Sequence, residues 1–159
     1  MDMIDFAPPK TVWRDKSDLN KLLGQMAPLH RARVEAAVRS GERRVGAVYR
    51  RIRKGEQRAE IRYDGLAGCI RTLKGGSSRQ LLLVSENGEL GLRPMLAAEA
   101  ARLMGLPASY KLPKSQTAAI SLCGDGLCVP AVTWLSKHFL APLLQQKAVF
   151  RRKDERIGA

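Results

Sequence analysis

The tetrapeptide Glu86-Asn87-Gly88-Glu89 limits most strongly what this chain can fold into. Asn-Gly is favoured in tight turns whose two central residues both need a positive φ, and such turns join neighbouring antiparallel strands. A short apolar run over 81–84 precedes the turn, and Leu90 and Leu92 alternate with other residues after it. The sequence therefore predicts a β-hairpin, and with it an antiparallel sheet.

More strands precede this hairpin, and helices flank it. Between residues 43 and 63 apolar and charged residues alternate imperfectly, and Lys54-Gly55-Glu56 divides the stretch as a turn. Helical periodicity, with proline near two of the starts and glycine after two of the ends, predicts helices over 17–23, 28–40, 96–104 and 130–144. The expected fold class is α+β, a small strand-rich domain followed by C-terminal helices.

Charge narrows the class of partner. The 159 residues include 28 Lys and Arg against 15 Asp and Glu, which gives a net charge of +13. An acidic small-molecule substrate explains such an excess poorly, whereas a polyanion fits it, most simply nucleic acid or failing that an anionic membrane surface. Aromatic residues make up 5% of the chain, which argues against a single-strand platform of stacked rings.

Cysteine usage and hydropathy indicate a reduced, soluble, cytoplasmic protein. Cys69, Cys123 and Cys128 form no CxxC pair, so neither a disulfide framework nor a zinc site of the usual spacing is expected. The N-terminus lacks the apolar core of a signal peptide. No uninterrupted apolar run approaches the roughly 18 residues of a membrane span. We expect no metal and no membrane partner.

Two stretches are candidate contacts for a polyanion. Eight cations lie between residues 39 and 58, and arginine, whose planar fork suits phosphate, dominates there. The segment 71–79 combines glycines, hydroxyls and flanking cations, so its backbone could approach a phosphate chain closely. It is no nucleotide P-loop, because GK[ST] does not follow. A solvated strand surface and an ordinary glycine-rich loop are the alternatives for these two stretches.

A third candidate is Gly124-Asp125-Gly126-Leu127, close to an expected helix start near Pro130. Backbone groups at such a start can accept a small anionic or polar ligand, although an ordinary turn followed by proline explains the pattern equally well. No catalytic set emerges from the sequence. Neither histidine has a nearby nucleophile in a recognisable frame, and the carboxylates are scattered among cations.

Three motifs, taken in order, resemble the C-terminal part of a DNA (cytosine-5) methyltransferase. Gly-Leu-Ala, Arg-Thr-Leu and Gly-Gly-Ser-Ser-Arg within 65–79 are similar to the target-recognition region. An arginine, a Glu-x-x-Arg helix and Gly-x-Pro within 93–107 are similar to the penultimate motif. Gly-Asp-Gly-Leu and Val-Pro within 124–130 are similar to the last motif. Order and spacing agree over about 65–144.

The resemblance implies roles for particular residues. The recognition region would read base edges in the major groove of duplex DNA, and the last motif would close one side of an S-adenosylmethionine pocket shared with a partner chain. The residues expected to contact DNA are Arg50, Arg51, Arg53, Arg71, Thr72, Lys74, Gly75, Gly76, Ser77, Ser78 and Arg79. Those expected to organise the region are Arg93, Glu99 and Arg102. Those expected at the cofactor are Gly124, Asp125, Gly126 and Leu127.

Residues that perform the family's chemistry are missing from the sequence. No cysteine follows a proline, and neither the Glu-Asn-Val motif nor the Phe-x-Gly-x-Gly cofactor loop occurs. We therefore expect no catalytic residue in this chain. Ala97-Ala98 stand where the penultimate motif commonly has Pro-Arg, and Asp125 stands where asparagine is usual. These departures fit a decayed copy.

The sequence thus predicts the DNA-recognition half of a split or truncated methyltransferase, nucleoid-associated and partnered by a catalytic chain. Apolar residues wrap more than half of the last helix, so we expect the C-terminal helices to pack on a missing α/β methyltransferase domain. The expected parts are 1–42 joining the catalytic half, 43–110 for recognition, 111–144 for the last motif and helix, and a basic tail, 145–159. The alternatives are a non-enzymatic DNA-binding module, an inactive remnant and, on charge alone, an RNA-associated protein.

Overall fold

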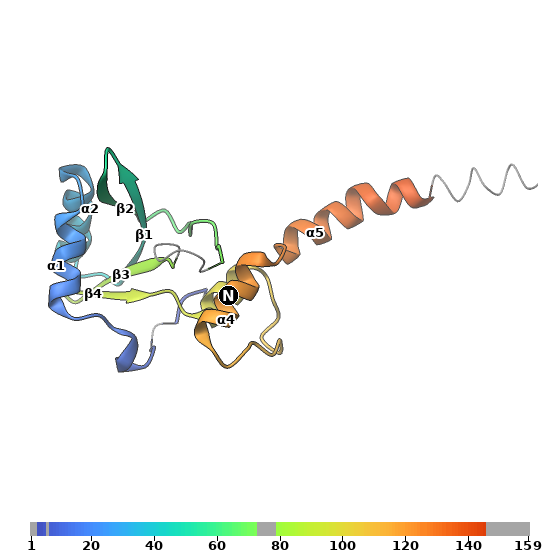
Figure 1. Cartoon of the computed structure of the whole chain (residues 1–159), viewed down its shortest axis with the longest axis horizontal. Coiled ribbons are helices and arrows are strands. Elements are labelled where there is room, and N and C mark those ends of the chain that lie inside the picture. The colour runs from blue at the N-terminus through green and yellow to red at the C-terminus, as the bar shows by residue number, and fades with distance from the viewer. Residues whose placement is uncertain (1–2, 6, 73–78, 146–159) are drawn as a thin grey trace, which may run out of the picture.

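The computed structural model describes residues 3–5, 7–72 and 79–145, in which a sheet with helices packed on it forms a body and one helical stretch projects from it (Figure 1). The elements are η1 (Lys10–Val12), α1 (Lys16–Gly24), α2 (Pro28–Arg39), β1 (Arg44–Arg53), β2 (Glu56–Arg62), β3 (Leu81–Glu86), β4 (Glu89–Pro94), α3 (Ala97–Leu103), α4 (Gln116–Asp125), α5 (Val129–Leu135) and η2 (Ser136–Leu140). The first η element is a 3-10 turn and the second is π-helical.

The four strands form one antiparallel sheet in the order β2-β1-β3-β4. The expected Asn-Gly turn joins β3 to β4, and Asn87 and Gly88 have φ values of 50° and 81°. Lys54 and Gly55, at 51° and 78°, make the matching turn between β1 and β2. The α+β class expected from the sequence is confirmed.

Helices α1 and α2 cover one face of the sheet. Leu22 and Val34 from these helices pack with Val48, Ile61 and Leu83 from the strands, and all five side chains are at most 4% exposed. The alternation of each strand places these residues on a single face. The main core therefore joins the two leading helices to the strands.

The opposite face packs against α3 and α4. Leu82 and Met95 from the strand side meet Ala100 of α3 and Cys123 of α4 in a second cluster. Helix α4 was not predicted from the sequence. Its start signal is Ser115, whose Oγ accepts a hydrogen bond from the backbone N–H of Ala118 at 3.4 Å.

The start of α1 also differs from the expectation. The helix begins at Lys16 rather than at residue 17, and Asp15 caps it, because its side chain accepts the backbone N–H of Asp18 at 2.8 Å. The expected ends of α2 and α3 are confirmed. Gly41 and Gly105 follow those helices with φ values of 66° and 76°, a conformation that suits glycine after a last turn.

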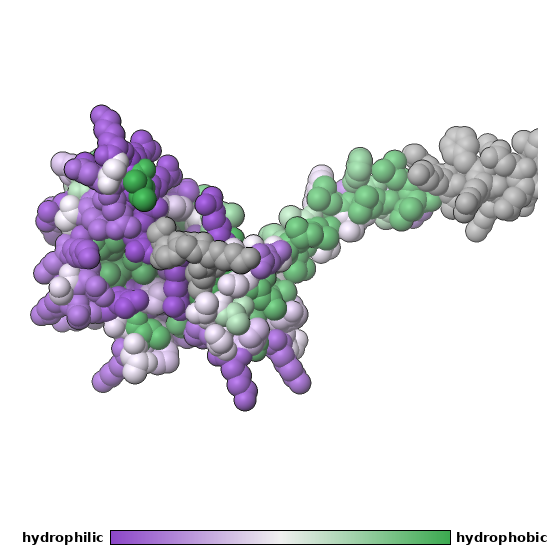
Figure 2. Space-filling view, in the orientation of Figure 1, coloured by the Kyte–Doolittle hydropathy of each residue, from purple (hydrophilic) through white to green (hydrophobic). Residues whose placement is uncertain are grey.

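A helical arm, residues 129–145, projects from the body and is apolar over most of its surface (Figure 2). Trp134 is 61% exposed, Phe139 59% and Leu144 67%. The π-helical stretch lies just before Pro142, which has no N–H and would crowd the preceding turn of a regular helix. The arm begins as the sequence predicts, with proline in its first turn.

By length and composition, the stretch Gln116–Gln145 could cross a membrane, with a mean hydropathy of 1.5 in its best window, 17% of which is buried. This differs from the sequence expectation, which considered only uninterrupted apolar runs. Residues 126–128 leave the helical conformation between α4 and α5. Such a break would expose unpaired backbone groups to lipid. One helix of this kind is a weak indication of membrane insertion.

Candidate nucleic-acid interface

The candidate interface forms where two strands separate. Strand β1 pairs with β3 only through Arg44–Val48, but it continues beside β2 as far as Arg53. Among the described residues, the outer half of β1 therefore has no strand on its β3 side. The recognition segment, residues 63–80, returns to the sheet at this opening, and residues 73–78 of it lie outside the described residues.

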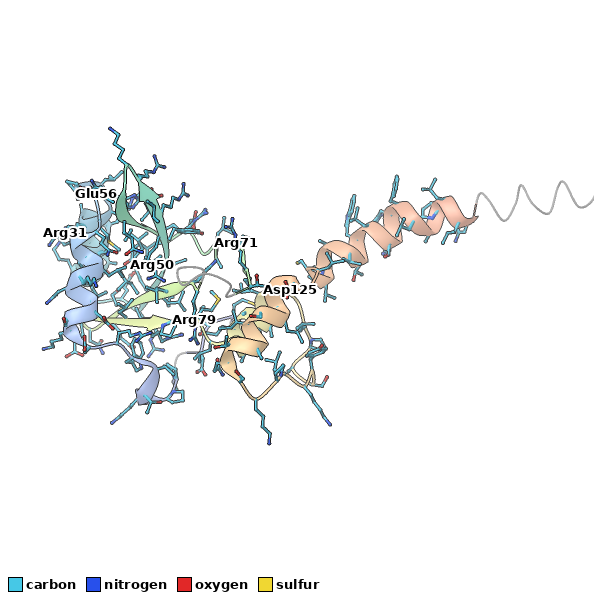
Figure 3. The ribbon with its side chains drawn as sticks, viewed as in Figure 1. Arg31, Arg50, Glu56, Arg71, Arg79 and Asp125 are labelled. Carbon is cyan, nitrogen blue, oxygen red and sulfur yellow. The ribbon has the colours of Figure 1, made fainter. Side chains whose placement is uncertain are left out.

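A groove of about 430 Å³ lies between the outer half of β1 and the recognition segment. Four arginines line it: Arg50, Arg51, Arg71 and Arg79. Figure 3 shows Arg50, Arg71 and Arg79 around the opening, on separate stretches of the chain. We call this cavity the recognition groove. Two of the expected DNA-contacting stretches thus meet in space, although about 20 residues separate them in the sequence.

Gln80 fixes the near end of the recognition segment. Its side-chain oxygen accepts the backbone N–H of Gly68 at 3.1 Å, and its side-chain nitrogen donates to the carbonyl of Cys69 at 3.3 Å. A side chain at Gly68 would lie 2.6 Å from the Tyr49 ring and 2.5 Å from Gln80. The segment therefore approaches β1 closely only because position 68 is glycine.

The arginines of the groove differ in their partners. Arg51 lies 3.7 Å from Glu60, and Arg53, which does not line the groove, lies 3.9 Å from the same carboxylate. Both are long, exposed ion pairs of low energy. Among the described residues no acidic group pairs with Arg50 or Arg79. The Nε of Arg79 is buried and meets no acceptor there. Burial first, and then the nearby charge of Arg14, lowers the pKa of Arg79.

The other cations of 39–58 do not share this groove. Arg39 pairs with Glu35 on α2, while Arg44 pairs with Glu42 at the opposite end of β1. Thr72, half-buried, lies against α4. The remaining expected DNA contacts lie outside the described residues: Lys74, Gly75, Gly76, Ser77 and Ser78.

Arg93 and Glu99 form a fully buried ion pair. The two Nη atoms of Arg93 donate to the Glu99 carboxylate at 2.9 and 2.6 Å, and both side chains are 0% exposed. The same carboxylate accepts the backbone N–H groups of Leu96, at the start of α3, and of Asp5. Trp13 lies over the guanidinium at 5.7 Å. This pair joins β4, α3 and the N-terminal residues.

Arg102, also expected to organise the recognition region, contacts a different part of the chain. Its Nε donates to the carbonyl of Met3 at 3.1 Å, and Arg93 donates to the carbonyl of Asp5 at 3.0 Å. All three motif residues therefore form hydrogen bonds with the backbone of residues 3–5. No local sequence signal points to this contact, because the backbone atoms involved lie about 90 residues away in the chain.

The residues expected at the cofactor occupy the end of α4 and the turn after it. Gly124 and Asp125 belong to the last turn of α4, so they do not precede the arm directly as the sequence suggested. A side chain at Gly124 would meet the backbone of Arg71 and Thr72 at 2.3 Å. Leu127, in the following turn, is 76% exposed. This exposed turn could form one wall of a cofactor site but encloses none by itself.

Ala97 shows how the penultimate motif tolerates its departure from the usual sequence. The residue is 2% exposed, and its backbone N–H donates to the side-chain oxygen of Gln116 at 3.0 Å. Proline has no N–H to donate. The change thus comes with a contact between α3 and α4 that the usual residue could not make.

The described residues contain no cluster of three or more His, Cys, Asp or Glu that could hold a metal ion. Further cations, not predicted as candidates from the sequence, lie beside the recognition groove. Arg14 and Lys21, with Gln57 of β2, line a second groove next to Arg50 and Arg79. Only the overall positive charge could have pointed to them.

Comparison with known proteins identifies the family of this arrangement. Residues 12–140 match the model of the C-5 cytosine-specific DNA methylase family, and the chain therefore belongs to that family. The chain is also 34% identical to the Type II methyltransferase M.HpaII of Haemophilus parainfluenzae, across 50% of this chain and 26% of that protein. It thus spans about a quarter of that relative. No solved structure matches the chain.

Proposed function

We propose that this chain is the DNA-recognition part of a cytosine-5 methyltransferase. It binds duplex DNA through the recognition groove, while the catalytic part of the enzyme lies outside these 159 residues. The observation that carries the proposal is the meeting of Arg50, Arg51, Arg71 and Arg79 in one groove. A guanidinium group can bind two phosphate oxygens at once. Contacts of this kind to the DNA backbone fix a protein on its duplex.

The proposed need for a catalytic part rests on the missing chemistry and on the arm. No cysteine of the chain follows a proline, so the family's nucleophile is not supplied here. The arm exposes Leu135, Phe139 and Leu144 among other apolar side chains. Burying a side chain of this size stabilises an interface by roughly 1.5–3 kcal/mol. We propose that the arm packs against the α/β catalytic domain of the same family.

S-adenosylmethionine is the methyl donor that membership of this family implies. Gly126 and Leu127 would form one wall of its site, and the catalytic part would supply the remainder. The exposure of this turn fits such a shared site. Gly124 has another role in the proposal, because its missing side chain lets the recognition segment cross α4.

Binding of the whole chain to a short DNA duplex tests the recognition role. Arg71→Gln is expected to weaken binding about tenfold and to make the affinity less dependent on salt. Arg39→Gln removes the same charge from α2, where Glu35 pairs with it, and serves as the control. Equal affinities for the two variants at every salt concentration would contradict a role for the recognition groove.

Reconstitution tests the need for a catalytic part. The chain is mixed with a catalytic part of a cytosine-5 methyltransferase that lacks its own recognition region, and methyl transfer to duplex DNA is measured. Activity of the mixture, but of neither component, is expected. Duplex binding without complex formation would instead favour a non-enzymatic DNA-binding module or an inactive remnant.

A further inference from the structure

A second groove, of about 340 Å³, lies between α1 and the open end of the β1–β3 pair. We call it the α1 groove. Four cations line it, two from the sheet side and two from the N-terminal residues: Arg50, Arg79, Arg14 and Lys21. Arg50 and Arg79 also line the recognition groove, so the two cavities share a wall.

The charge of the α1 groove is poorly balanced within the described residues. Asp18 is the one carboxylate among the residues that line it. The nearest approach of Asp18 to Arg14 is 3.8 Å, and about half of each side chain is exposed. A pair of this length and exposure contributes little energy. Four cations therefore face a single, weakly held acid.

Arg79 contributes a buried, unpaired polar atom to this groove. Its Nε is buried without a hydrogen-bond acceptor among the described residues. The charge that it meets is that of another arginine, Arg14, which together with burial lowers the pKa of Arg79. Two guanidinium groups that line one groove with a single, weakly paired acid favour the binding of an anion.

We propose that the α1 groove binds one phosphate group between Arg79 and Arg14, with Lys21 and Arg50 beside it. In this site charged N–H donors hold an oxyanion. A DNA backbone or free phosphate can supply that oxyanion. Assigning the phosphate to a DNA backbone rests on the proposed function. The shared wall favours that source, because a strand leaving the recognition groove passes Arg50 and Arg79 directly.

A matched pair of charge removals tests the DNA source. Arg14→Gln removes a cation from the α1 groove, and Arg31→Gln removes one from α2, outside both grooves (Figure 3). Arg14→Gln is expected to weaken duplex binding about tenfold and to lower the slope of log affinity against log salt by about 0.9, the value for one phosphate contact. Identical affinities and slopes for the two variants would overturn a DNA phosphate in this groove.

Titration with inorganic phosphate separates this inference from the proposed function. The Nε–H signals of Arg79 and Arg14 are followed by NMR in the whole chain, and both are expected to shift on saturation. Shifts in a chain that binds no duplex would support the phosphate site and overturn the DNA-recognition role. A chain that shows neither shifts nor duplex binding would overturn both.

Discussion

Glu99 accepts hydrogen bonds from four donors at once, and none of its surface reaches solvent. Two of the donors are the Nη atoms of Arg93, and the others are backbone N–H groups of Asp5 and Leu96. Removing one member of a buried ion pair leaves the other charge without compensation. Breaking the pair is therefore expected to cost much stability.

We expect Glu99→Gln to lower the free energy of unfolding by about 3–5 kcal/mol, since the buried guanidinium of Arg93 loses its counter-charge. Urea denaturation of the whole chain measures this loss. Glu56→Gln is the matched control, because Glu56 pairs with Arg58 on the surface with 68% of its side chain exposed. Its expected cost is under about 1 kcal/mol. Equal losses of unfolding free energy in both variants would contradict the expected cost of breaking the buried Arg93–Glu99 pair.

Tyr63 predicts a pH dependence of stability. Burial raises its pKa to about 12 from an ordinary value of 10.0. The unfolded chain therefore loses this proton first, and the stabilisation present below pH 10 is lost as the pH rises towards 12. Tyr63→Phe is expected to remove this loss, and it sacrifices no hydrogen bond to a described residue.

Ultraviolet absorbance of tyrosinate during an alkaline titration checks this expectation. The late part of the transition should disappear in Tyr63→Phe and persist in Tyr110→Phe, whose side chain is 45% exposed in the native protein. A late transition that survives in Tyr63→Phe would contradict the assignment to Tyr63.

Helix α4 links the last motif to the recognition segment through one missing side chain. A Cβ at Gly124 would lie 2.3 Å from backbone atoms of Arg71 and Thr72, and backbone cannot rotate aside as a side chain can. We expect Gly124→Ala to cost about 1–3 kcal/mol of stability and to weaken duplex binding by moving the segment. Unfolding and duplex titration of the same variant measure both effects.

Gly24→Ala makes the same substitution in α1, where a Cβ meets nothing within 4 Å. Because alanine favours helix over glycine by up to about 1 kcal/mol, this control should be neutral or slightly stabilising. If Gly124→Ala behaved in the same way, the close packing of α4 on the recognition segment would be excluded.

The elements that the sequence predicted are those with local signals. Asn87-Gly88 determines a turn by its own backbone preference, and proline and glycine mark the limits of α2. Helix α4 was missed because apolar residues occupy its exposed side as well as its buried one, which removes a clear period. Leu122 is 37% exposed, whereas Ala119 and Cys123 are buried.

The grooves could be predicted only in part. Arg50 and Arg71 belong to stretches whose charge marked them as candidates, but their meeting depends on where β1 parts from β3. Arg14 lines the same groove as Arg79, 65 residues away in the chain, where a backbone hydrogen bond to Leu92 joins Arg14 to β4. Long-range placement of this kind follows from the whole fold and leaves no pattern in nearby residues.

At the scale of the whole molecule, the arm and the body differ in what holds them in place. The arm extends away from the sheet, and within the described residues its apolar side chains are largely uncovered (Figure 2). Its attachment includes a hydrogen bond from the backbone N–H of Val129 to the carbonyl of Met104 at 2.9 Å and close contact of Pro130 with Gly105. Changes on the arm should therefore leave the folding of the body intact.

We expect Phe139→Glu to abolish capture of the catalytic part while changing duplex binding by the chain alone less than twofold. Phe139 is 59% exposed, so the body loses almost no packing. Sedimentation of the mixed components measures the complex. Thr133→Glu adds the same charge to the arm at a polar residue and should preserve assembly. Loss of assembly in both variants would point to charge alone, and retention in both would contradict docking through the arm.

The contact between Asp5 and Glu99 has a consequence for the order of events during synthesis. Ninety-four residues separate the two partners, so Asp5 leaves the ribosome long before α3 has been synthesised. At about 5–20 residues per second, that interval lasts roughly 5–20 s. The hairpin of β1 and β2, whose partners are close in the chain, can close at once. The N-terminal residues can therefore make this contact only after α3 has been synthesised, when all four strands have already left the ribosome.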